Sequence, residues 1–175
     1  TDGVEVGHVQ VRGPTLFDGY WGRPHATQDA FTHDGWFKTG DLAVMKAVVA
    51  GETPYLTVVD RRRDLILVGG ENVYTSEVEN ALYNHVCVRE ACVYGVPEAV
   101  LGQVVKAVVV LDEDHIPEGI EIDVIRAALE SHCEAQLAIF KRPVFWEIRY
   151  EALPRTGSGK VKRNELRDRD LVDAL

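Results

Sequence analysis

The middle of this 175-residue sequence contains the stretch DRRRDLILVGG at residues 60–70. Its apolar run at 65–68 is typical of a short buried strand, and two glycines end it. The three arginines before the run cannot all point to one side of an extended chain, so some are solvated while others could meet phosphate, ribose or a carboxylate. The sequence also changes here, from strands and loops to alternating strands and helices. The stretch therefore predicts a boundary between two units, either a hinge or a charged linker.

Beyond residue 64 the hydrophobic pattern predicts a compact α+β unit. Ser76 and Glu79 have the S-x-x-E spacing of a capping box, with apolar residues at helical spacing after them. We expect helices at 76–86 and 123–138, a short charged helix at the C-terminal end, and strands at 65–68, 91–96, 104–111 and 144–150. One small core supports this order of elements.

Before residue 60 the pattern predicts strands and loops, and it contains no convincing helix. Alternating residues at 4–12 indicate a half-buried strand, and strand-like runs follow at 42–49 and 55–59. The turn-rich stretch 14–40 needs its aromatic rings as anchors, namely Phe17, Tyr20, Trp21, Phe31, Trp36 and Phe37. This part looks unable to close a core alone. The predicted fold class is α+β, with a β-rich segment up to about residue 60 and then a short antiparallel sheet flanked by helices.

The composition excludes several classes of protein. Hydrophobic residues make up 46% and charged residues 27%, which excludes collagen-like and disordered chains. The net charge of −9 argues against a nucleic-acid binder that relies on phosphate contacts. The cysteines Cys87, Cys92 and Cys133 have no metal-ligand spacing, which fits buried thiols in a reducing compartment. The first residue is not Met and no signal peptide opens the chain, as expected of an excised fragment of a cytoplasmic protein.

The charge is unevenly distributed along the chain. Residues 141–175 carry nine basic and six acidic side chains, whereas residues 1–140 carry ten basic and 22 acidic ones. A weakly basic tail on an acidic body suggests a local contact with an anion. A solvated helix face is the alternative that the charges alone favour.

A second motif, GWFKTGD at residues 35–41, places the carboxylate of Asp41 after a glycine turn. A carboxylate in this position can accept hydrogen bonds from two neighbouring hydroxyls, such as a ribose diol. Taken alone, an Asp after a Gly is usually a turn residue.

A third motif, LPRTGSGKVKR at residues 153–163, places Lys160 at the end of a glycine-rich turn. It superficially resembles a Walker A loop. That interpretation fails, because Pro154 stands where the loop needs Gly and Val161 where it needs Ser or Thr. Alone, the motif is typical of a surface turn.

Together and in this order, the three motifs resemble the adenylate-forming superfamily of acyl-CoA synthetases, nonribosomal adenylation domains and firefly-type luciferases. The resemblance runs from about Gly3 to Arg169. It implies that residues 1–62 end a large AMP-binding domain and that residues 63–175 form a mobile lid domain carrying the catalytic lysine. The sequence Gly69-Gly70-Glu71-Asn72 is most similar to acyl- and aryl-CoA ligases.

The resemblance also implies a role for each site residue. Asp41 would hold the ribose hydroxyls of ATP, Arg61 would contact ribose or phosphate, and Lys160 would bridge the substrate carboxylate and the α-phosphate or ribose oxygen. Gly69 and Gly70 would let the pantetheine arm of CoA approach. Asn72 stands where some relatives have an Arg that meets CoA phosphate. The hinge would lie at Arg63 and Asp64, where the family usually has Asp or Lys in place of Arg63.

The expected partners follow from what the family has upstream of these residues. Its phosphate loop, its acyl pocket and its Mg-binding glutamate have no counterpart here, so we expect a fragment that is inactive without the N-terminal domain. ATP or AMP, CoA, a carboxylic acid and Mg²⁺ are the expected ligands. Two alternatives are an adenylation domain that loads a carrier protein and a non-catalytic regulatory module. The final residues, 173–175, are not an S-K-L peroxisomal signal. The segment Val44–Pro54 is longer and more apolar than the usual turn and has no functional explanation.

Overall fold

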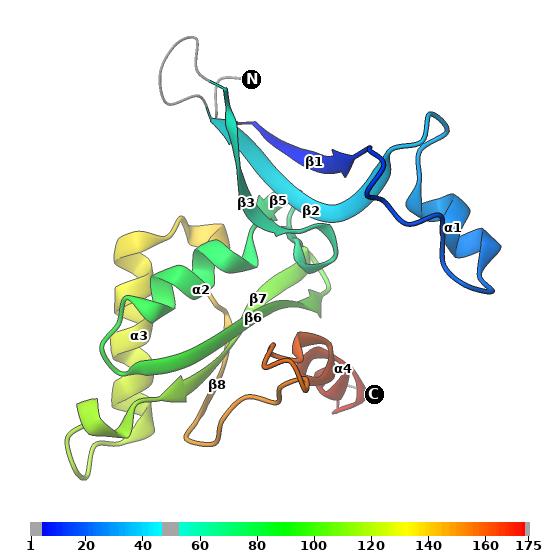
Figure 1. Cartoon of the computed structure of the whole chain (residues 1–175). Helices are drawn as coiled ribbons and strands as arrows, with labels where there is room; N and C mark the ends of the chain where they lie inside the picture. The colour runs from blue at the N-terminus through cyan, green and yellow to red at the C-terminus, as the bar shows by residue number, and fades with distance from the viewer. Residues whose placement is uncertain (1–4, 47–52, 174–175) are drawn as a thin grey trace. The chain divides into compact units, whose positions relative to one another are not determined.

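The computed structural model describes residues 5–46 and 53–173. They divide into two compact units, Thr1–Arg63 and Asp64–Leu175. Each unit is described by itself below. The chain has an α+β fold, as predicted, with antiparallel strand pairs in both units and helices around the sheet of the second (Figure 1).

The first unit is built on a three-stranded antiparallel sheet in the order β1-β2-β3. The strands are β1 (Val6–Val11), β2 (Phe37–Lys46) and β3 (Tyr55–Arg61). All three were predicted, although β2 begins five residues before the predicted strand at 42–49. Residues 47–49 of that prediction, and most of the Val44–Pro54 segment, lie outside the described residues.

The absence of a helix before residue 60 was a wrong prediction. Helix α1 (Pro24–Ala30) begins with Pro at its first turn, where a missing N–H costs nothing. Its seven residues are too few to show a helical period, and none of them is buried. Thr27 holds it to the preceding turn by accepting a hydrogen bond from the Tyr20 N–H at 2.9 Å. Short-range contacts therefore form this helix, without an apolar face.

Aromatic rings anchor the turn-rich stretch, as expected. Phe17 lies within 5.7 Å of the ring centroids of Tyr20, Phe31 and Phe37. Two of the six expected rings lie elsewhere, since Trp36 stacks under the guanidinium of Arg12 and Trp21 is fully exposed.

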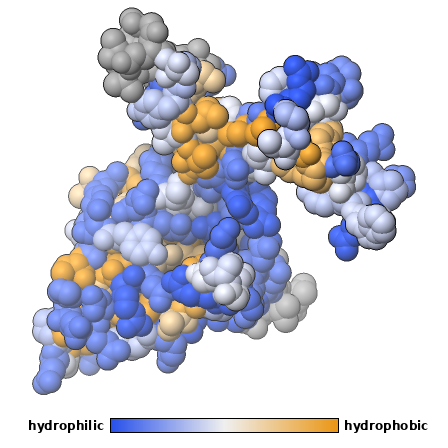
Figure 2. Space-filling model, viewed as in Figure 1, coloured by the Kyte–Doolittle hydropathy of each residue, from blue (hydrophilic) through white to orange (hydrophobic). Residues whose placement is uncertain are grey.

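The sheet of the first unit leaves apolar side chains exposed. Figure 2 shows the orange surface over these strands. The exposed apolar residues of β2 and β3 are Met45, Tyr55, Leu56 and Val58. The exposed patch agrees with the expectation that this part cannot complete a core by itself.

The second unit is built on a five-stranded sheet in the order β5-β4-β7-β6, with β8 also paired to β7. Its strands are β4 (Ile66–Val68), β5 (Glu71–Val73), β6 (Val88–Glu98), β7 (Gly102–Leu111) and β8 (Phe145–Arg149). The pairs are antiparallel except β7–β8, which is parallel and aligns Lys106 with Phe145. The long connection through helix α3 makes this parallel pairing possible.

Three helices surround this sheet: α2 (Thr75–Tyr83), α3 (Ile122–Gln136) and α4 (Arg163–Asp173). Helix α2 begins one residue before the predicted start and has Tyr74 at its N-cap. Side chains that alternate along β6 and β7 divide the core into two layers. One layer packs against α2 and α3 through Val93, Val105, Leu82 and Leu129, and the other against α4 through Tyr94, Val108, Leu153 and Leu166 (Figure 1).

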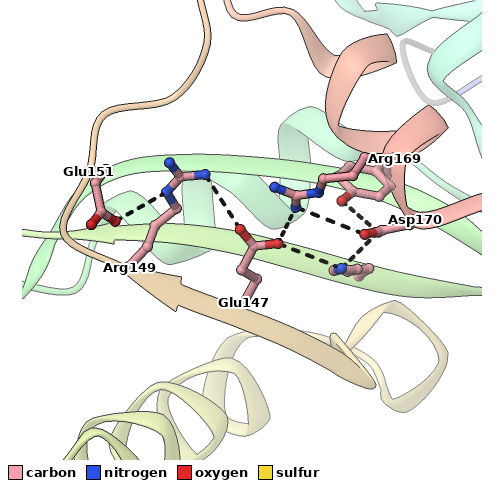
Figure 3. A network of polar contacts seen from close by, with 7 residues as sticks. Glu147, Arg149, Glu151, Arg169 and Asp170 are labelled. Carbon is pink, nitrogen blue, oxygen red and sulfur yellow. Dashed lines mark hydrogen bonds and ion pairs between the residues drawn. The ribbon is translucent and has the colours of Figure 1, made fainter. Parts of the chain in front are cut away.

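A polar network fastens α4 to the sheet (Figure 3). Asp170 of α4 accepts a hydrogen bond from the Tyr94 hydroxyl at 2.7 Å and pairs with Lys106 Nζ at 2.7 Å. Arg169 of the same helix binds Glu147 of β8. Glu147 also contacts Arg149, whose other partner is Glu151. Burial and the Asp170 carboxylate raise the pKa of Tyr94, so the hydroxyl stays a donor.

Replacing Tyr94 by Phe removes the hydroxyl that Asp170 accepts from and leaves the ring in place. We expect the free energy of unfolding to fall by about 1.5–3 kcal/mol, as for a hydrogen bond to a charged group. Urea denaturation of the 175-residue chain measures it. Tyr150→Phe, at a partly exposed position, is the control. Equal stability of the two variants would contradict the role of the network.

His85 of the second unit lies beside a second histidine, His132. The rings of His85 and His132 meet edge to face at 5.0 Å, and burial together with the nearby His132 lowers the pKa of His85. The unfolded state therefore takes up a proton first. Stability that is present above the ordinary histidine pKa of about 6.5 is lost as the pH falls below it.

We expect the free energy of unfolding to decrease between pH 7.5 and 5.5, and to decrease less in His85→Gln. Urea denaturation at several pH values compares the two slopes. Identical slopes would show that His85 does not contribute.

Candidate functional site

Asp41 and Arg61 lie opposite each other on neighbouring strands of the first unit. The register of β2 and β3 pairs these two residues, and Arg61 Nε lies 3.5 Å from Asp41 Oδ1. Thr39 fixes the approach to Asp41, since its hydroxyl accepts the Asp41 N–H at 3.0 Å and donates to the Val9 carbonyl at 3.0 Å. Gly40 between them has a φ of +80°, which favours glycine. The structure thus brings together two of the predicted site residues.

An open hollow lies beside this pair. It has a volume of about 480 Å³ and is lined by Thr39, Gly40 and residues 61–63. Of the three arginines, Arg61 ends β3 while Arg62 and Arg63 begin a short 3-10 helix, Arg62–Asp64. The Asp60 carboxylate accepts the Arg61 N–H at 2.7 Å and holds the backbone there. A hollow rimmed by guanidinium groups beside a half-exposed carboxylate fits a ligand that carries both phosphate and hydroxyl groups.

Lys160 stands on a closed loop of the second unit. The backbone pairs Arg155 with Val161, and the Thr156 N–H donates to the Lys160 carbonyl at 2.8 Å. The Lys160 N–H donates to the Thr156 hydroxyl at 3.2 Å. The loop reverses at Gly159, with a φ of +84°. The Lys160 side chain is exposed, and its ammonium has no carboxylate of a described residue within ion-pair distance.

The N-terminal side of this loop is held by Arg155. Its guanidinium donates to the Gly159 carbonyl at 2.8 Å and binds the Glu90 carboxylate of β6. Leu153, just before the loop, is buried in the core layer under α4. The loop is therefore attached to the sheet through both an apolar and a charged contact.

The C-terminal side of the loop is held by Arg163, the first residue of α4. Its two terminal nitrogens each lie 2.7 Å from a carboxylate, one from Asp64 and the other from Glu79 of α2. Glu79 also accepts the N–H of Val93 in β6 at 2.8 Å. Burial lowers the pKa of Arg163, but the charges of Glu79 and Asp64 outweigh it and raise the pKa above its ordinary value.

The sequence did not indicate that Arg155, Arg163 and Glu90 hold the loop of Lys160. Arg163 and Asp64 are 99 residues apart in the chain, so no local pattern connects them. The only available signal was the place of both arginines within the motif around Lys160.

Gly69, Gly70 and Asn72 share one exposed hairpin between β4 and β5. Both glycines have positive φ values, +57° and +91°. A Cβ on Gly69 would lie 3.2 Å from Leu101, whereas one on Gly70 would meet open space. Asn72 lies opposite Leu67 in the register and is exposed. The hairpin thus offers bare backbone at its tip, on elements separate from the Lys160 loop.

Two of the three cysteines are buried, as expected. Burial raises the pKa of Cys92 and of Cys133 to about 11, which keeps both thiols protonated and unreactive. Cys87 is only half-buried.

Two kinds of structural feature are absent from residues 5–46 and 53–173. Within these ranges, no group of three or more His, Cys, Asp or Glu side chains is arranged to hold a metal ion. No helix in the same ranges has the length and apolar character needed to cross a membrane.

Comparison with known proteins gives consistent matches. Residues 77–160 match the family described as AMP-binding enzyme C-terminal domain. The chain is 42% identical over 166 residues to a long-chain-fatty-acid–CoA ligase of Yersinia pestis, with 94% of the chain but only 27% of that protein covered. It is also 42% identical over 165 residues to a feruloyl-CoA synthase of Amycolatopsis, with 94% and 31% covered.

Solved structures give the same result. ATP-bound MatB from Rhodopseudomonas palustris matches with a TM-score of 0.80 and 36% identity, over 95% of this chain and 30% of that one. The o-succinylbenzoate CoA synthetase of Bacillus subtilis, in complex with its acyl-adenylate intermediate, matches with a TM-score of 0.78 and 37% identity, over 96% and 31%. The chain therefore spans about a third or less of the proteins it matches. From these matches and the motifs that carry them, the chain belongs to the adenylate-forming, AMP-binding enzymes and corresponds to their C-terminal part.

Proposed function

We propose that this chain is the C-terminal part of an ATP-dependent, AMP-forming acyl- or aryl-CoA ligase. The observation that carries the proposal is Lys160, an exposed cation on a hydrogen-bonded loop, with no carboxylate partner among the described residues. Relatives named as fatty-acyl, feruloyl and o-succinylbenzoate CoA ligases support it. Residues 1–62 would end the large domain and residues 63–175 would form the lid.

In the first half-reaction, a carboxylate oxygen of the acid attacks the α-phosphorus of ATP. A new P–O bond forms, the bond to the β-phosphate oxygen breaks, and pyrophosphate leaves with the electron pair. Negative charge gathers where the two anions meet. Lys160 would place its ammonium between the substrate carboxylate and the α-phosphate, where one fixed donor is typically worth about 3–4 kcal/mol of transition-state stabilisation.

Asp41 and Arg61 would hold the nucleotide in this step. The Asp41 carboxylate would accept hydrogen bonds from the two ribose hydroxyls, and Arg61, whose Nε lies 3.5 Å from Asp41 Oδ1, would contact ribose or phosphate. The guanidinium groups around the neighbouring hollow add positive potential.

In the second half-reaction, a thiolate attacks the acyl carbon of the adenylate. A C–S bond forms, the bond between the acyl carbon and the phosphate oxygen breaks, and AMP leaves with the electron pair on that oxygen. Gly70 leaves space at the tip of the β4–β5 hairpin, so the pantetheine arm of CoA could pass close to the backbone there. Asn72 on the same hairpin could donate to a CoA phosphate. A carrier-bound thiol would use the same approach and remains an outcome of the test below.

Between the two half-reactions the lid would change its position by moving about a pivot at Arg63. Asp64 is only 8% exposed and is paired with Arg163 inside the second unit. Because Asp64 is fixed in this way, we place the pivot at Arg63, where the first unit ends. The ligands of Mg²⁺, the acid pocket and the phosphate loop would belong to the N-terminal domain. The chain alone would be inactive. The cytoplasm and fatty-acid metabolism are the proposed setting.

Lys160→Ala in the longer protein that contains these residues should reduce ATP–pyrophosphate exchange at least about a hundredfold, because a fixed donor to the crowded oxygens is lost. The assay runs over a panel of fatty and aryl acids, with CoA or a carrier protein as the acceptor in a second step. Lys162→Ala is the matched control, since Lys162 pairs with Glu165. An unchanged exchange rate in Lys160→Ala would reject the assignment.

Compared with Arg63→Ala, which also lacks the guanidinium, Arg63→Pro should release pyrophosphate at about the same rate and form the thioester more slowly, because Pro restricts the backbone on which the rearrangement depends. Single-turnover assays separate the two steps. Arg63→Ala keeps backbone freedom and serves as the control. Equal loss of both half-reactions in Arg63→Pro would contradict a pivot at this residue.

A further inference from the structure

We propose that Arg155 and Arg163 are positioning residues for Lys160. They would clamp the two sides of its loop to the second unit, so that the ammonium is presented in one geometry. This inference rests on the function proposed above and goes beyond it, because neither arginine needs to touch a substrate.

Arg155 contacts both the loop itself and the sheet. One nitrogen of its guanidinium binds the carbonyl of Gly159, the residue directly before Lys160, at 2.8 Å. Another binds Glu90, a residue of β6 whose side chain is only 14% exposed. The same side chain therefore closes the loop and attaches it to the sheet.

Arg163 clamps the other side three residues after Lys160. Its guanidinium spans Asp64 and Glu79, both at 2.7 Å, in a largely buried position. Two bonds from a planar group fix its direction, which a single ammonium could not do. The start of α4 is thereby held at one place.

The clamp matters because a lysine side chain is flexible, so the position of its ammonium depends on where the backbone is held. The backbone bonds within the loop, such as Thr156 N–H to Lys160 O, keep its shape but do not attach it to the sheet. Misplacing a catalytic group by about 1 Å can cost about a hundredfold in rate.

The charges of the motif agree with a positioning role for the arginines and a ligand-binding role for Lys160. Each of the other cationic side chains in the motif has a carboxylate partner: Arg155 with Glu90, Lys162 with Glu165, and Arg163 with Asp64 and Glu79. Among the described residues, Lys160 is the one cation of the motif whose charge is not matched. The clamp arginines are neutralised in place, and the positive charge offered to an anion is that of Lys160.

The test is a double-mutant cycle in the longer protein, with Arg155→Met and Arg163→Met made alone and together with Lys160→Ala. Each arginine variant should slow ATP–pyrophosphate exchange about tenfold to a hundredfold at saturating ATP, with little change in KM. On the Lys160→Ala background each should change the rate less than about twofold, because a residue that acts only through Lys160 has nothing left to position. Thioester formation from a supplied acyl-adenylate should be unchanged.

Arg169→Met is the matched control, because Arg169 is also an arginine of α4 and pairs with Glu147 and Asp170, which lie outside the loop. Arg163→Met leaves two carboxylates poorly solvated and could unfold the unit, so Arg163→Lys accompanies it. The Arg155 side chain is 44% exposed, so we expect Arg155→Met to fold. The activity of this variant is therefore the deciding test of the clamp. Hydrogen exchange of the 175-residue chain should be faster at residues 156–162 in Arg155→Met and unchanged there in Arg169→Met.

Any one of three results would overturn the clamp. They are full activity of Arg155→Met, losses of activity that add to that of Lys160→Ala, and unchanged hydrogen exchange at residues 156–162 in Arg155→Met. A Lys160→Ala protein with full activity would instead reject the proposed role of Lys160, and the clamp with it.

Discussion

The second unit depends on one guanidinium, that of Arg163, held between the carboxylates of Asp64 and Glu79. Removing three charged groups from water is costly, and the cost is offset only when the geometry is good and the remaining hydrogen bonds are made. Both contacts here are 2.7 Å long. Taking away one member of such a set leaves uncompensated charge and typically costs about 3–5 kcal/mol. The first residue of the unit, helix α2 and helix α4 are thus joined at a point that tolerates little change.

Glu79 extends this junction to the edge of the sheet. Strand β6 pairs with β7 on one side only, and α2 supplies side-chain partners to its other side. Glu79 accepts the N–H of Val93, and the Tyr83 hydroxyl accepts the N–H of Ala91 at 3.1 Å. An uncovered edge would present unpaired backbone groups to another chain. The same carboxylate therefore closes a sheet edge and fixes the helix that follows the Lys160 loop.

Periodicity in the sequence was enough to predict helices α2 and α3, because burial on one face repeats along them. Strand β7 was predictable as a β-branched apolar run, which is buried almost throughout. Periodicity failed for α1, which has no buried face, and it did not indicate that β8 joins β7 in parallel, a pairing between distant segments. For the site, the three motifs together, through their resemblance to the adenylate-forming enzymes, made Asp41, Arg61 and Lys160 candidates, although each motif alone is typical of a turn or a linker. They could not reveal the partners of Arg155 and Arg163, because an ion pair between residues far apart leaves no mark on local sequence.

The uneven charge of the sequence has a structural explanation that neither initial interpretation contained. Eight of the nine basic residues between 141 and 175 have a carboxylate within ion-pair distance. Several of these carboxylates come from the acidic part of the chain, namely Asp64, Glu77, Glu79, Glu90 and Glu134. The tail is therefore not simply a solvated helix face, and the local contact with an anion stays a prediction for Lys160. The acidic part of the chain pairs with four of the nine basic residues, and carboxylates of the tail itself pair with four more. Among the described residues, Lys160 keeps an unmatched charge on a loop that its neighbours hold in place.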